Sequence, residues 1–165
     1  MPTRERLLMD PQWRFHRGDI SFPKGHDGWL FAGNFKYGAV PPQFDDSIWR
    51  VVDLPHDFVV EGEFVRDPAC LNVAPVFNPH RNHGSLATGV AWYRKQFIIP
   101  ATDAGRRLSL EFDGVARDSV VWLNQHYLGR HLSGYTGFRR DITDIANYGA
   151  LNTLAVRVDS SEYEG

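Results

Sequence analysis

RLSLEFDGVARDSVVWLNQHYLGRHLSGYTGFRRDITDIANYGALNTLAVRVD, residues 107–159, is the stretch that decides the fold. Apolar and polar residues alternate in 108–112 and again in 153–159, which is the period of a strand with one buried face. Residues 119–123 are β-branched and aromatic, and Asn124-Gln125 supplies a two-residue turn after them. The predicted strands of this stretch are 108–112, 119–123, 126–129, 138–142 and 153–159, with one helical turn at 143–146. Strands this short and evenly spaced predict an antiparallel β-sandwich.

The same alternation predicts which side chains form the core. The inward positions are expected at Leu110, Phe112, Val121, Leu123, Leu154, Val156 and Val158. Glu111 alternates with them and is expected to face solvent.

Several phrases of the sequence resemble the N-terminal sugar-binding domain of glycoside hydrolase family 2, which includes β-galactosidases, β-glucuronidases and β-mannosidases. They are LEFDGVARDSVVWLNQHYLG, GYTGFRRDITD and NTLAVRVD, preceded in the family's order by FDDSIWRVVDLPHDF (44–58) and GVAWYRKQF (89–97). The resemblance covers roughly residues 10–160. It implies an all-β fold, an antiparallel jelly-roll sandwich like that of galactose-binding domains. It also implies that 1–165 is one sugar-binding domain, the N-terminal fragment of a larger multidomain hydrolase.

Composition agrees with one domain and excludes several partners. A chain of 165 residues with 42% hydrophobic content is long enough for a single core. A net charge of −2 gives no reason to expect nucleic acid or an anionic membrane as partner. The single cysteine, Cys70, excludes an intrachain disulfide framework. Because the N-terminus lacks the apolar core of a signal peptide, the protein is either cytoplasmic or begins after a removed signal.

The first half of the chain is expected to supply supporting elements. Trp13 and Phe15 share one face of 10–18, which predicts an edge strand laid on the core. Residues 45–48 are expected to form one helical turn, capped by Asp45 or Asp46, with the other carboxylate solvated. Strands are predicted at 50–54 and at 92–100. In the second of these, Tyr93, Lys95 and Phe97 are expected on one face and Trp92, Arg94 and Gln96 on the other.

Two histidine-containing stretches invite functional interpretations. His56-Asp57 could be half of a hydrolytic triad, but the chain has no serine on a G-x-S-x-G turn to complete it. His80 and His83 lie three apart in the irregular segment 67–88, without a cysteine or patterned carboxylate to complete a metal shell. We therefore expect neither a catalytic residue nor a metal or other cofactor in this chain.

Residues 67–88 form an unusually long irregular segment, and such segments are frequently functional. In the resembled family, the loop before the W-Y-R-K strand reaches toward the sugar site of the neighbouring catalytic domain. The resemblance thus makes Arg81, Asn82, His83 and Thr88 candidate substrate-binding residues. The segment departs from the Asn-Pro-Thr-Gly lead-in of the β-galactosidase pattern, which puts galactose specificity in question.

The family also implies where the chemistry lies. Its two catalytic glutamates are on a (β/α)₈ barrel that follows this domain, and retaining glycosidases need such a pair about 5–5.5 Å apart. The resemblance thus predicts that the fragment alone is inactive. It predicts a whole protein that is a retaining β-glycosidase, β-galactosidase-like, sharing its β-glycoside substrate with this domain. Whether that enzyme is a homo-oligomer stays open.

The alternative is a free-standing carbohydrate-binding module with an exposed aromatic platform. The aromatic side chains available for it are Trp29, Tyr127, Tyr135 and Phe138.

Overall fold

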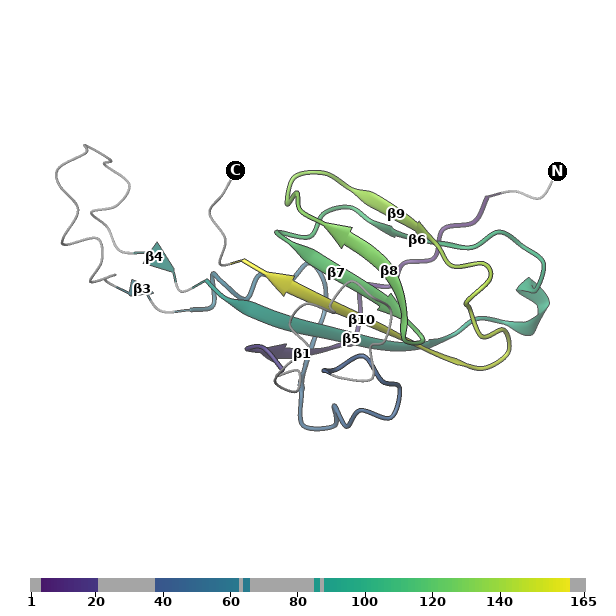
Figure 1. The fold of residues 1–165 in the computed structure, drawn as a ribbon, viewed down its shortest axis with the longest axis horizontal. Coiled ribbons are helices and arrows are strands. Elements are labelled where there is room, and N and C mark those ends of the chain that lie inside the picture. The colour runs from purple at the N-terminus through teal and green to yellow at the C-terminus, as the bar shows by residue number, and fades with distance from the viewer. Residues whose placement is uncertain (1–3, 21–37, 63, 66–84, 87, 161–165) are drawn as a thin grey trace.

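The structure, a computed structural model, describes residues 4–20, 38–62, 64–65, 85–86 and 88–160 (Figure 1). Its elements are β1 (Trp13–Arg17), β2 (Arg50–Val52), β3 (Phe64–Val65), β4 (Ser85–Leu86), β5 (Val90–Ile98), the 3-10 turn η3 (Ala101–Asp103), β6 (Ser109–Phe112), β7 (Ser119–Leu123), β8 (His126–His131), β9 (Phe138–Asp141) and β10 (Leu151–Asp159). Among these residues no helix is long and apolar enough to cross a membrane.

A six-stranded sheet is the body of the fold, in the order β2-β1-β5-β10-β7-β8. All of its strand pairs are antiparallel. The last strand, β10, lies in the middle, where Val156 pairs with Tyr93 of β5 on one side and with Val121 of β7 on the other. β6 and β9 form a separate antiparallel pair that lies over this sheet (Figure 1).

The sequence therefore predicted the antiparallel all-β class correctly, and the jelly-roll connectivity stays a prediction. Every strand predicted in 107–159 is present, with ends shifted by at most two residues. The prediction of an edge position for the first strand is wrong, because β1 is flanked by β2 and β5. Trp13 and Phe15 of β1 nevertheless lie in the core, as their shared face predicted.

The hairpin between β7 and β8 shows how local sequence sets the register. Asn124 and Gln125 both have positive φ angles, 49° and 71°, as a two-residue hairpin turn requires. The Asn124 side chain also ties the turn to β10, because its Oδ1 accepts from Thr153 N at 2.9 Å and its Nδ2 donates to Asn152 Oδ1 at 2.8 Å. The turn thus joins β7 to β8 and also holds β10 through the Asn124 side chain.

The six-stranded sheet is buried on both faces. The face toward β6 and β9 carries the larger hydrophobic core, which contains Trp13, Phe15, Tyr93, Leu110, Val121, Leu123, Ile142, Leu154, Val156 and Val158. The opposite face packs against residues 38–49 and holds Ala39, Val40, Trp49, Trp92, Val120, Trp122 and Ala155. Of the predicted core positions only Phe112 is merely half-buried, and it stacks on Phe138 with ring centroids 4.6 Å apart.

Arg94 is buried on the face of the sheet that packs against residues 38–49, a burial that the sequence-based predictions did not address. Its side chain has no exposed surface; Nη1 donates to Ala39 O at 2.8 Å, and Nε lies 3.1 Å from Asp46 Oδ2. Asp46 is therefore an ion-pair partner and not the solvated neighbour that the sequence suggested. Asp45 does accept from Ser47 N at 3.0 Å, but residues 45–48 form a turn and not a helical one.

The remaining helical expectation is only partly met. At 143–146 the chain makes a turn in which Ala146 N donates to Ile142 O at 3.0 Å. The one 3-10 element of the described ranges, η3, lies in the connection after β5, where the sequence predicted no helical element.

Candidate functional site

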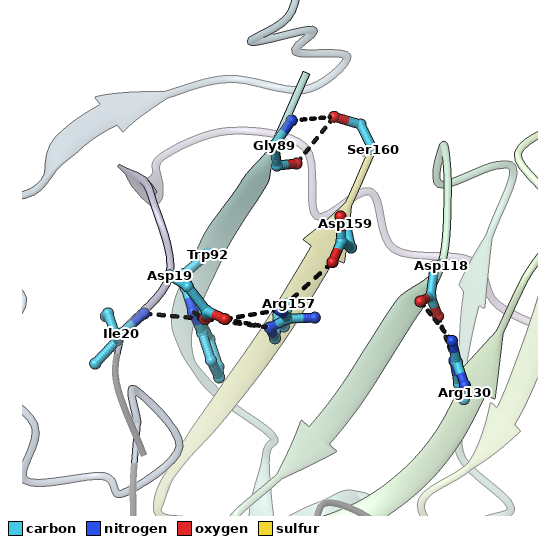
Figure 2. Close-up of polar contacts among 9 residues, drawn as sticks. All are labelled: Asp19, Ile20, Gly89, Trp92, Asp118, Arg130, Arg157, Asp159 and Ser160. Atoms are coloured by element: carbon cyan, nitrogen blue, oxygen red, sulfur yellow. Dashed lines mark hydrogen bonds and ion pairs between the residues drawn. The ribbon is translucent and has the colours of Figure 1, made fainter. Parts of the chain in front are cut away.

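The strand order brings several distant segments to one end of the sheet. β1, β10 and β8 end there, and β5 and β7 begin there, because Arg17 pairs with Ala91, Asp159 with Val90, and Ser119 with His131. Thr88, a candidate residue two positions before the start of β5, lies at the same end. We call this end of the sheet the site edge (Figure 2).

Three hydrogen bonds between Ser160 and Gly89, which we call the clasp, fix the chain next to Thr88. Ser160 Oγ accepts from Gly89 N at 3.0 Å and donates to Gly89 O at 2.9 Å. Ser160 N also donates to the same carbonyl at 2.9 Å. Thr88 is exposed beside this clasp. Because these bonds hold Gly89, the backbone next to Thr88 is fixed at the end of β5.

Asp19 is the electrostatic centre of the site edge. Its Oδ1 accepts from the Trp92 indole N–H at 2.9 Å, and its Oδ2 accepts from Arg157 Nη2 at 2.7 Å (Figure 2). Partial burial opposes ionisation of Asp19, but the hydrogen bonds from Arg157 and Trp92 outweigh it and lower the pKa of the carboxyl. The carboxylate is therefore charged and fully occupied at neutral pH.

Two further acidic side chains at this edge are also engaged with arginines. Asp159 Oδ2 lies 3.5 Å from Arg157 Nη2, so Arg157 bridges two carboxylates. Asp118 receives Arg130 through both oxygens, with Nη2 to Oδ2 at 2.5 Å. The backbone of Asp118 also joins the start of β7 to the end of β10, because Asp159 N donates to Asp118 O at 3.1 Å.

These contacts determine what the site edge can do chemically. A carboxylate that is held by arginine and indole donors has a lowered affinity for protons and is a poor general acid. Within the described ranges no group of three or more His, Cys, Asp or Glu side chains could hold a metal ion. The network instead fixes the strand ends and Gly89, the residue before β5.

Of the four predicted substrate-binding residues, only Thr88 can be placed. Arg81, Asn82 and His83 lie outside the described residues, as do His80, Cys70 and Trp29. The structure therefore shows where the predicted loop joins the sheet and not how its side chains are arranged.

His56 and Asp57 do not form half of a triad. Asp57 Oδ1 accepts from Val59 N at 2.9 Å, a local turn contact. His56 Nδ1 lies 2.8 Å from Tyr93 Oη, and His56 Nε2 lies 3.2 Å from Glu61 Oε1. Burial, and after it the charges of Asp57 and Glu61, raise the pKa of Tyr93, so its phenol stays protonated. The cluster joins the loop after β2 to β5.

Two of the aromatic side chains proposed for a carbohydrate-binding platform pack against other rings of the domain. Tyr127 packs against Trp122 with ring centroids 6.4 Å apart, and Phe138 stacks on Phe112. Tyr135 alone among the three described is fully exposed. Among the described members of this set, one exposed ring is not the platform that a carbohydrate-binding module needs.

Sequence reasoning missed the network at the site edge. Arg157 and Asp159 showed only as the outward positions of an alternating strand. Asp19, the partner of Arg157, lies 138 residues away from it in the sequence, and no local pattern signals the pairing.

Comparison with known proteins is consistent across sequence and structure. Residues 26–163 match the family described as "Glycosyl hydrolases family 2, sugar binding domain". The beta-galactosidase BoGH2A of Bacteroides ovatus is 38% identical over 160 residues, which are 96% of this chain and 16% of that protein. A putative beta-glucuronidase of Formosa agariphila is 34% identical over 70% of this chain and 10% of its own length.

Solved structures give the same result. A glycosyl hydrolase family 2 member from Bacteroides cellulosilyticus superposes with a TM-score of 0.69 and 34% identity, over 93% of this chain and 17% of that one. The chain thus spans less than a fifth of the length of these relatives.

Proposed function

Because the chain belongs to the sugar-binding domains of glycosyl hydrolase family 2, we propose that it is a non-catalytic N-terminal domain lining the rim of a β-glycosidase active site. The relatives it matches are named as β-galactosidases and β-glucuronidases and are several times longer. We infer that the whole protein is a retaining β-glycosidase whose catalytic carboxyl pair lies outside residues 1–165. Its substrate would be a β-glycoside of galactose or of a related sugar.

The occupied carboxylates at the site edge support the non-catalytic role. A retaining glycosidase needs one free carboxylate as nucleophile and one carboxyl group with a raised pKa as acid. The pKa of Asp19 is shifted in the opposite direction. Asp118 is held by Arg130 through both of its oxygens.

The observation that carries the rim proposal is the clasp beside Thr88. Three hydrogen bonds hold Gly89 to Ser160, at the point where residues 81–88 join the sheet. A loop anchored on a rigid sheet can present hydroxyl, amide and imidazole groups to sugar hydroxyls. Each such hydrogen bond contributes about 0.5–3 kcal/mol, depending on charge.

The absence of activity in the isolated domain is the first expected outcome. Residues 1–165 alone should not hydrolyse nitrophenyl β-galactoside, β-glucuronide or β-mannoside, whereas the complete gene product should hydrolyse at least one. Turnover by the isolated domain above the rate of heat-treated protein would refute the non-catalytic assignment.

The rim contribution is tested at Thr88 in the complete gene product. Thr88→Val removes the hydroxyl and keeps the branched shape, and kcat/KM should fall by about 2- to 150-fold, which corresponds to one lost hydrogen bond. Arg81→Ala, Asn82→Ala and His83→Ala should fall in the same range. Thr102→Val is the matched control, since Thr102 is exposed in η3 at the other end of β5. Kinetics unchanged by all four loop substitutions would refute the proposal.

A free-standing carbohydrate-binding module is less well supported. The relatives in both sequence and structure are much longer than this domain. Isothermal titration of residues 1–165 against mono- and oligosaccharides distinguishes the two hypotheses. An independent module should bind sugar without the rest of the protein, whereas a domain that supplies only the rim of an active site should bind it very weakly.

A further inference from the structure

The loop between β8 and β9, residues 132–137, presents two apolar side chains to solvent. Tyr135 has a relative exposure of 101% and Leu132 of 64%. An aromatic side chain this exposed is unusual, because burying it would be favourable by a few kcal/mol of apolar area and packing. We call residues 132–137 the docking loop, since a partner that covered them would gain that apolar area.

Hydrogen bonds fix the docking loop from within. His131 Nε2 lies 3.0 Å from Thr136 O and 3.1 Å from Thr136 Oγ1, so the histidine at the end of β8 spans the loop. Tyr135 N donates to Ser133 Oγ at 3.2 Å, which sets the backbone at the tyrosine itself.

Two glycines allow the docking loop to pack closely against residues 112–116, which precede β7. A Cβ at Gly134 would lie 2.8 Å from Ala116 Cβ, and a Cβ at Gly137 would lie 2.9 Å from Phe112 O. The backbone at both positions is thus in direct contact with residues 112–116 and leaves no room for a side chain. A loop built this way holds Tyr135 in a defined position.

A fixed loop with an uncovered aromatic at its tip has the properties of an interface anchor. The ordering of its backbone is already paid for in the folded domain, so association costs less conformational entropy. Tyrosine is enriched among the residues that dominate binding energy at protein interfaces. A sugar ligand fits less well, since neighbouring polar groups of the loop, such as Ser133 and Thr136, are hydrogen-bonded internally.

The position of the docking loop indicates what covers it. His131 pairs with Ser119, and Ser119 pairs with Val158 of β10, so two strand spacings, about 10 Å, separate His131, which precedes the loop, from Val158. Ser160, the last residue that the structure describes, therefore lies at the same end of the sheet as the docking loop. The relatives devote more than four-fifths of their length to regions outside this domain.

We propose that Tyr135 and Leu132 are the anchors through which this domain docks on the catalytic part of its own polypeptide, which follows residue 160. The proposal rests on the proposed function for the identity of that part. It goes beyond it in assigning the contact surface, which is separate from the candidate sugar-binding loop 81–88. The docking would hold the rim residues in register with the catalytic carboxyl pair.

Photo-crosslinking in the complete gene product tests the contact directly. Replacing Tyr135 with photoreactive benzoylphenylalanine should give, on irradiation, a crosslink to a residue beyond 165 in the same chain, identified by mass spectrometry. Mixing ¹⁴N- and ¹⁵N-labelled protein distinguishes this from a crosslink between two copies. A crosslink to a second copy, one confined to residues 1–165, no crosslink, or a gene product that ends at residue 165 would each overturn the proposal.

Inactivation kinetics give a second, independent measurement. Tyr135→Ala should raise the rate constant of thermal inactivation of the complete enzyme by about 5- to 30-fold, the effect expected of an interface anchor. Ile98→Ala is the matched control, because Ile98 is 66% exposed at the opposite end of the sheet. Equal inactivation rates in the two variants would contradict the proposal. Unchanged kcat/KM in all four loop variants would contradict the rim function and leave this contact standing.

Discussion

The ion pair between Arg94 and Asp46 should be strongly coupled energetically, and removing its acidic member should cost more than removing both. Arg94 has no exposed surface, and burial lowers its pKa, opposed by the charge of Asp46. Asp46→Ala would leave the guanidinium charged in the second face of the sheet, with the Ala39 carbonyl at 2.8 Å as its best partner. Breaking a buried pair from one side typically costs about 3–5 kcal/mol.

The structure reduces that figure somewhat. The Asp46 side chain is still 19% exposed, so the pair is not fully desolvated. We expect Asp46→Ala to lower the free energy of unfolding by about 2–4 kcal/mol, which is a fall in Tm of about 5–15 °C for a domain of this size. Arg94→Met fills the same space without a charge but removes the Nη1 donor from the Ala39 and Pro41 carbonyls, at a cost of about 1–3 kcal/mol.

A double-mutant cycle in urea measures the coupling. The variant Arg94→Met/Asp46→Ala should be no less stable than Arg94→Met alone, because the buried charge is gone and Asp46 has nothing left to pair with. The coupling energy should therefore be at least about 1.5 kcal/mol. If the two single effects simply add, Asp46 does not neutralise Arg94, and the reasoning from burial is refuted.

Two further outcomes are expected from burial and from charge. Leu154→Ala should cost about 2–5 kcal/mol in urea unfolding, because Leu154 is 1% exposed, whereas Leu151→Ala on the same strand, 49% exposed, should change it by less than about 0.5 kcal/mol; equal urea midpoints would contradict the core assignment. Hydrogen bonds from Thr143, and then from Arg107, lower the pKa of Asp141 to about 2, so its stabilising effect is present above the usual pKa and is lost as pH falls toward 2. Asp141→Asn should therefore flatten the fall of Tm between about pH 5 and pH 2, with Asp144→Asn as control, and an unchanged slope would count against this contact.

The strands were predictable because their signals are local. The Asn124-Gln125 turn and the alternation in β6 and β10 depend on neighbours in sequence, so the hairpin and the core positions could be assigned without the structure. The resemblance to a known family supplied the context for these elements.

The buried polar groups were not predictable for the opposite reason. The alternation of β5 places Arg94 on one face with Trp92 and Gln96 but does not show what covers that face, and the packing of residues 38–49 on it buries Arg94. Asp19 and Arg157 meet because β1 and β10 both flank β5. The partners in both contacts are far apart in the sequence, so the pattern of neighbouring residues does not predict either contact.

The central place of β10 has a consequence for synthesis on the ribosome. Among the described strands of this domain, β10 is the last to be translated, yet it alone joins β5 to β7. Until Leu151–Asp159 has left the exit tunnel, β1, β2 and β5 on one side and β7 and β8 on the other have no strand between them, and both expose open edges. The nascent chain therefore stays without its main sheet for nearly the whole time that the domain is made. A message broken before codon 151 would yield two groups of strands without the strand that joins them, and not a smaller version of the domain.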